Sequence, residues 1–77
     1  MTVKVGDIYP AGGKGPRFWL VVSLYDAGQV HGTRACLLGL DNLEDMNVIS
    51  AQTYGACFMS RRKLVCHIDI TQMRLQP

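Results

Sequence analysis

Residues 17–25, RFWLVVSLY, are the stretch that decides the fold. An apolar side chain occupies every even position, namely Phe18, Leu20, Val22 and Leu24. The odd positions are mixed in polarity. Because the side chains of a strand alternate between two faces, this pattern predicts a β-strand whose even positions point into the core.

Four more short strands are expected, because alternating apolar residues recur between clusters of turn residues. Glycine appears too often along the chain for a long helix to form. The expected strands cover residues 3–9, 33–41, 48–54 and 64–70, and one 3₁₀ turn is expected within 56–63. The inward positions are predicted to be Cys36, Leu38 and Leu40 in the third strand and Leu64, Cys66, Ile68 and Ile70 in the last, with His67 and Asp69 facing water.

This order of elements predicts an all-β fold that occupies residues 1–77 as a single domain. The expected architecture is a small five-stranded SH3-like barrel with one short 3₁₀ turn before the last strand. A five-stranded OB-type barrel is the alternative, although that fold usually carries more helix between its third and fourth strands.

Charge and cysteine content restrict the class of protein. Eight Lys and Arg against six Asp and Glu give a net charge of +2, which is far below that of a dedicated DNA-binding domain. The three cysteines, Cys36, Cys57 and Cys66, are an odd number and indicate a reducing compartment. No signal peptide and no long apolar run is evident. We therefore expect a cytoplasmic protein, in the host cell if a phage encodes it, without a membrane partner.

The glycine-rich stretch 12–15, GGKG, resembles a phosphate-binding loop only superficially. A Walker loop needs Ser or Thr after the lysine and a helix behind it, whereas Lys14 is followed by Gly15, Pro16 and an expected strand. The stretch is therefore interpreted as a hairpin loop with an exposed lysine. No cofactor is expected.

Metal binding and catalysis are also not expected. The histidines and cysteines lack the paired spacing of a zinc site, so no metal is predicted. Cys57 lies near the basic residues 61–63, which could lower the pKa of its thiol, but no histidine is placed to serve it. The sequence therefore indicates a protein that is not an enzyme.

The outward positions of residues 17–25 supply the candidate binding surface. Trp, Tyr and Arg dominate the energetics of protein interfaces, and strand alternation predicts that Arg17, Trp19 and Tyr25 share one outer face beside Lys14. The alternative is that Trp19 is partly buried. The surface would suit a partner protein, a homodimer contact or a nucleic-acid stacking platform. The predicted partner-binding residues are Lys14, Arg17, Trp19, Tyr25, Arg61, Arg62 and Lys63.

The opening of the chain resembles the MazF/PemK toxin family. The motif 5-VGDIY-9, the glycine loop and 17-RFWLVVS-23 are similar to a pattern that recurs in this family on an SH3-like barrel. The resemblance implies RNA cleavage, with Arg17 as a participating residue. However, Pro16 precedes the arginine instead of following it, and residues 35–41 lack the threonine expected there. Ribonuclease activity is therefore kept as the third interpretation.

A looser resemblance is to small proteins of phages and prophages. It is based on the G-D-I-Y opening, the glycine loop, 18-FWLVV-22 and the late R-R-x-L at 61–64. Such proteins often bind and block a host machine, including CRISPR complexes. The resemblance implies a non-catalytic accessory or inhibitor protein that binds a host protein or ribonucleoprotein complex, with a nucleic-acid-binding barrel as the alternative.

Overall fold

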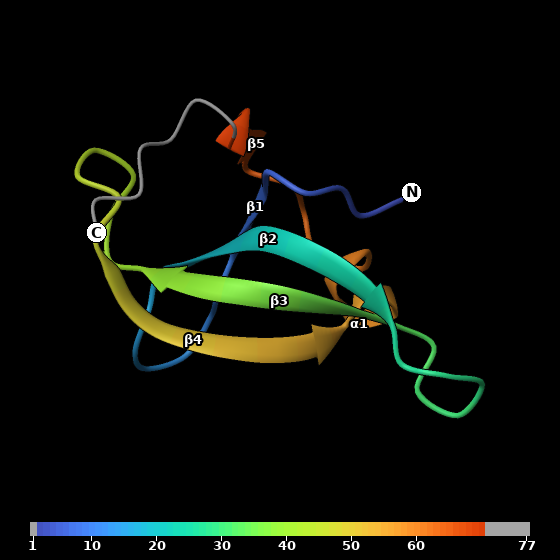
Figure 1. The fold of residues 1–77 in the computed structure, drawn as a ribbon. Helices are drawn as coiled ribbons and strands as arrows, with labels where there is room; N and C mark the ends of the chain where they lie inside the picture. Colours follow the sequence, from blue (N-terminus) through green and yellow to red (C-terminus); the bar gives the residue numbers. More distant parts are fainter. Residues whose placement is uncertain (1, 71–77) are drawn as a thin grey trace, which may run out of the picture.

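Three hairpin connections fold the first four strands into an antiparallel meander (Figure 1). A helical turn and a short last strand follow. The elements of the computed structural model, which describes residues 2–70, are β1 (Asp7–Pro10), β2 (Phe18–Asp26), β3 (Thr33–Leu40), β4 (Val48–Gly55), α1 (Ala56–Met59) and β5 (Cys66–His67).

The sheet has the strand order β4-β3-β2-β1-β5. The last strand returns to the first, where Asp7 pairs with His67 and Ile8 with Cys66. The predicted all-β class with five strands is confirmed. The predicted barrel, however, is not closed, because within residues 2–70 the strands β4 and β5 remain the two edges of the sheet.

The segment before β5 forms a turn of α-helix instead of the predicted 3₁₀ turn. The Ser60 backbone N–H donates a 3.0 Å hydrogen bond to the carbonyl oxygen of Ala56, which is the i to i−4 spacing of an α-helix. Met59, on this turn, is almost fully buried. The helix therefore anchors the connection from β4 to β5 against the sheet.

Apolar side chains cover both faces of this sheet. The first cluster, called here the tryptophan cluster, contains the buried residues Val3, Tyr9, Ala11, Trp19, Val21, Ala35, Leu37 and Met59. The second, called the leucine cluster, contains Ile8, Leu20 and Leu40, with the partly buried residues Phe18, Val22, Leu43, Met46, Cys66, Ile68 and Ile70 packed against it.

This two-sided core explains why the inward set was only partly predicted. Ala35 and Leu37 are more deeply buried than Cys36 and Leu38, which were expected to point inward. Leu64 packs against the tryptophan cluster, although it was expected to share a side with Cys66. Strict alternation identifies one core-facing side only where the other face of the sheet meets water.

The orientation predicted for Trp19 is wrong, because the residue is only 6% exposed. A β-bulge between Val21 and Ser23 also shifts the alternation along β2. As a result Leu24 packs on the same cluster as Trp19, and the next residue, Tyr25, points to the opposite side. Tyr25 is 42% exposed, but it shares no outer face with Trp19.

Candidate functional site

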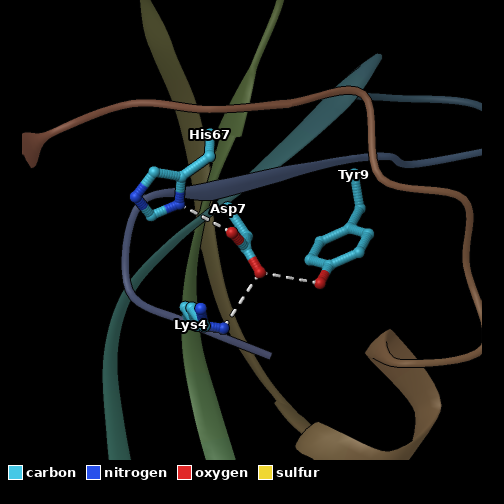
Figure 2. Close-up of polar contacts among 4 residues, drawn as sticks. All are labelled: Lys4, Asp7, Tyr9 and His67. Carbon is cyan, nitrogen blue, oxygen red and sulfur yellow. Dashed lines mark hydrogen bonds and ion pairs between the residues drawn. The ribbon is translucent and has the colours of Figure 1, made fainter. Parts of the chain in front are cut away.

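A buried carboxylate at the start of β1 organises the first polar site (Figure 2). Asp7 is only 4% exposed. Its Oδ2 atom accepts a 2.9 Å hydrogen bond from the backbone N–H of Lys4 and another of 2.9 Å from the Tyr9 hydroxyl. Its Oδ1 atom lies 2.7 Å from Nδ1 of His67. Three donors from three parts of the chain therefore hold this carboxylate.

A tight turn places Asp7 in this position. Its backbone N–H donates a 3.0 Å bond to the carbonyl oxygen of Lys4, which closes a four-residue turn. Gly6, the third residue of that turn, has φ of 99°, a conformation that a type II turn requires and that glycine adopts without strain. The Gly-Asp pair in the sequence thus has a local structural cause.

His67 extends the site toward solvent. Its side chain is 49% exposed, and it lines an open cleft of about 440 Å³ together with Thr2, Lys4, Asp7 and Leu64. Because Nδ1 faces the carboxylate, Nε2 is the ring nitrogen left for a ligand or a proton. Within residues 2–70 no hydroxyl or thiol hydrogen-bonds to it. The pair joins β5 to β1 and leaves one imidazole nitrogen accessible.

The hydrogen bonds of the site change the pKa values of two side chains. Burial alone would raise the pKa of Asp7, but the bonds from Lys4, His67 and Tyr9 and the charge of His67 outweigh burial and lower this pKa below its ordinary value. Burial, followed by the bond to Asp7 and the charge of Asp7, raises the pKa of Tyr9 to about 12. Neutral Tyr9 beside ionised Asp7 is therefore the stable combination.

Stability is expected to fall at both ends of the pH range. Asp7 contributes stability above the unfolded pKa of about 4, and this contribution is lost as pH falls through its lowered folded pKa. Tyr9 contributes below the unfolded pKa of about 10, and its contribution is lost as pH rises from there to about 12. Urea unfolding at a series of pH values measures both losses.

The matched variant for the alkaline loss is Tyr9→Phe. It removes the titrating hydroxyl and keeps the buried ring, so the variant is expected to be less stable at neutral pH but to lose less stability than the wild type above pH of about 10. An alkaline loss as steep in Tyr9→Phe as in the wild type would show that Tyr9 is not its source.

The second site is the contact of Arg62 with the loop between β1 and β2. Nη1 of Arg62 donates hydrogen bonds of 3.0 and 3.2 Å to the carbonyl oxygens of Pro10 and Ala11. The backbone N–H of Ala11 in turn donates to the carbonyl oxygen of Arg17. The turn after α1 is therefore fixed to the base of the glycine loop by Arg62.

Five of the seven predicted binding residues are exposed, and we call this set the basic surface: Lys14, Arg17, Arg61, Arg62 and Lys63. Arg62 contacts the base of the glycine loop, whereas the guanidinium of Arg61 lies over the Phe58 ring. Trp19 is excluded from it by burial in the core. Tyr25 lies at the far end of β2, next to the turn that leads to β3, so it does not belong to this surface.

The glycine loop itself is a hairpin connection. Gly12, Gly13 and Gly15 all have positive φ values, between 67° and 108°, and β2 follows the loop without an intervening helix. A phosphate-binding loop would need the N-terminal amides of a helix at this point. The loop therefore presents Lys14 on a bend.

Other candidate chemistry is sparse in the described part of the chain. Cys36, Cys57 and Cys66 are free thiols, and Cys57 is exposed. Among residues 2–70 no three side chains of His, Cys, Asp or Glu gather as metal ligands would. None of the helical structure in that range is long and apolar enough to cross a bilayer.

Sequence reasoning missed the pairing of Asp7 with His67. The two residues are 60 positions apart, and neither carries a local motif that points to the other. The available signal was the alternation of residues 64–70 together with an acidic residue at the start of the first strand. That signal identifies the partner only if β5 is already known to lie beside β1.

Comparison with known proteins adds no relative. No family model matches the chain, and neither a curated protein nor a solved structure matches it.

Proposed function

We propose that this chain is a non-catalytic binding module that docks on a ribonucleoprotein by contacting its RNA. The observation that supports the proposal is the attachment of Arg62 to Pro10 and Ala11, which fixes one cation of the 61–63 segment to the base of the glycine loop that carries Lys14. The proposal includes an accessory or inhibitor role of the kind expected for a small phage protein.

The charge distribution supports a polyanionic partner. No Asp or Glu occurs between residues 8 and 25 or between residues 46 and 68, which are the two segments that supply the basic surface. In the described range the ion pair of Asp7 with His67 does not involve these five cations. Their charge is therefore available to phosphate groups, and release of counterions would supply the binding free energy.

The shape of the surface also suits a nucleic-acid backbone. Lys14 lies on a loop whose glycines carry no bulky side chains, so a phosphate can approach the main chain closely. Arg62 uses one of its guanidinium nitrogens to bind two backbone carbonyl oxygens and so holds the turn after α1 against the loop. Arg17, Arg61 and Lys63 are exposed for contact. Such contacts predict binding with little base specificity.

Neutralising two cations is expected to weaken binding to single-stranded RNA. In the double variant Lys14→Gln/Lys63→Gln we expect roughly tenfold weaker affinity at low salt, and a slope of log affinity against log salt that is lower by about 1.4–2. Each substitution removes a cation from a different segment of the basic surface. Fluorescence anisotropy of a labelled oligouridylate measures both quantities.

The matched control is Gln29→Glu/Val30→Glu, which lowers the net charge by the same amount at exposed positions of the turn between β2 and β3. It should bind almost as well as the wild type. Equal losses in both variants would contradict a local RNA surface. Capture of a host protein from a nuclease-treated lysate, in a complex that survives high salt, would contradict the RNA contact. Cleavage of the RNA probe would instead show that the protein is a ribonuclease and not a non-catalytic binding module.

A further inference from the structure

Phe58 is the most exposed aromatic side chain of the protein. The exposed fraction is 59% for Phe58 and 42% for Tyr25, and the remaining aromatic rings are buried or half-buried. Neither apolar cluster of residues 2–70 includes Phe58, whereas its neighbour Met59 anchors α1 in the core. A single exposed ring is common on protein surfaces, so the surroundings of Phe58 decide what it can bind.

The surroundings of Phe58 are cationic. The guanidinium carbon of Arg61 lies 5.9 Å from the centroid of the Phe58 ring, within the range of a cation–π contact. The next residue, Arg62, donates to two carbonyl oxygens at the base of the glycine loop. Two adjacent arginines therefore connect the exposed ring to that loop. No Asp or Glu occurs between residues 46 and 68, so the segment that carries the ring would not repel a phosphate chain.

The Phe58 ring is held in place by close contact with the main chain. Its Cδ2 and Cε2 atoms lie 3.2 and 3.5 Å from the position that a Cβ atom of Gly55 would occupy. Because Gly55 has no side chain, the ring can lie against the backbone at the end of β4, directly before α1 (Figure 1). A ring that is already positioned loses little conformational entropy when it binds a flat partner.

From this arrangement we infer that Phe58 stacks on an unpaired base of single-stranded RNA, while Arg61 and its basic neighbours contact the adjoining phosphates. The inference rests on the proposed function, because it assigns a base-binding residue to the same RNA contact. Every nucleobase has a flat π-face, so the stacking tolerates different sequences. In a double helix the bases stack on one another, and the expected partner is therefore single-stranded RNA.

The test compares Phe58→Ala with the wild type by fluorescence anisotropy of a labelled oligouridylate. Removing the ring is expected to weaken binding roughly tenfold. The slope of log affinity against log salt should stay the same, because an uncharged ring releases no counterions. Phe58→Trp should bind at least as tightly as the wild type. Phe58→Leu keeps apolar bulk without a π-face and should bind as weakly as Phe58→Ala.

Two controls isolate the stacked base. Tyr25→Ala removes an exposed ring at the far end of β2 and should leave the affinity unchanged. A duplex of the oligouridylate with oligoadenylate presents phosphates but no unpaired base, so the wild type and Phe58→Ala should bind it equally. Circular dichroism establishes that the Phe58 variants are folded.

The possible failures of this inference and of the proposed function differ. If Phe58→Ala binds the single strand as tightly as the wild type while Lys14→Gln/Lys63→Gln binds more weakly, only the inference is overturned. A lower salt slope in Phe58→Ala would show that the ring merely positions Arg61, and an equal loss on the duplex would show that it stacks on no base. Either result also overturns the inference. A wild type that binds no RNA overturns both.

Discussion

Replacing Trp19 by alanine is expected to unfold a large fraction of the protein. The indole is 6% exposed and packs edge-on against Tyr54, with ring centroids 6.2 Å apart. Removing a buried Trp side chain costs about 3–5 kcal/mol, whereas a domain of this size has a total stability of roughly 4–12 kcal/mol. Urea unfolding followed by far-ultraviolet circular dichroism measures the loss.

Two variants separate burial from aromatic contact. Trp19→Phe keeps a ring in the cluster and should lose less stability than Trp19→Ala. Tyr25→Ala removes an exposed ring and should change stability by less than about 0.5 kcal/mol. Trp19 is also the only tryptophan of the chain, so its emission should be blue-shifted and resistant to acrylamide. Ready quenching in the folded wild type would contradict the buried position.

Gly6→Ala is expected to be the second most damaging substitution. The residue has φ of 99°, which costs an L-residue roughly 1–2 kcal/mol. A Cβ atom would also collide with the backbone carbonyl oxygen of Ile68, which cannot rotate away as a side chain could. Because the N–H of Ile68 donates to Gly6, the collision disrupts the junction of β1 with the segment after β5. The expected total is about 3 kcal/mol or more.

Gly13→Ala is the matched control for Gly6→Ala. Its φ of 77° imposes a similar backbone strain, but no atom lies within 4 Å of the position its Cβ would take. The two urea midpoints therefore separate strain from collision. If both variants lost the same stability, the close approach of Ile68 to Gly6 would have no energetic importance.

The hairpin part of the fold was predictable because its signals are local. The stretches expected to be strands at 17–25, 33–41 and 48–54 correspond closely to Phe18–Asp26, Thr33–Leu40 and Val48–Gly55. Each is bounded by turn residues and rich in apolar or β-branched side chains. The two outer strands were less predictable. Only Asp7–Pro10 and Cys66–His67 pair, because the Lys4–Asp7 turn shortens β1 and only two residues of the last segment reach it.

The side of each residue was harder to predict than the strand itself. Two physical features make the alternation rule fail to predict which side chains of β2 are buried. Apolar groups cover both faces of the sheet, and a bulge shifts the alternation after Val21. Neither feature can be recognised from a single sequence. For the same reason the exposed cations were identified correctly by type and loop position, whereas the role of Trp19 was not.

Of the candidate site, the exposed cations could be recognised from the sequence, but the contact of Arg62 with the glycine loop could not. Lys14 and the basic residues 61–63 were recognisable as exposed turn residues, but the hydrogen bonds from Arg62 to the glycine loop cross a separation of 51 and 52 residues. Such a contact depends on the path of the chain after α1. The Asp7–His67 pair is hidden for the same reason.

The pairing of the first strand with the last has a consequence for the order of folding. Strands β1 to β4 each pair with their neighbour in the chain, and short loops connect them. These strands can therefore form their hairpins as soon as about 55 residues have left the ribosome. The contact of Asp7 with His67 must instead close a loop of 60 residues, which carries a larger entropic cost. The meander of β1 to β4 is therefore expected to form first. The outer edge of β1 stays unpaired until the C-terminal segment that contains β5 has been synthesised.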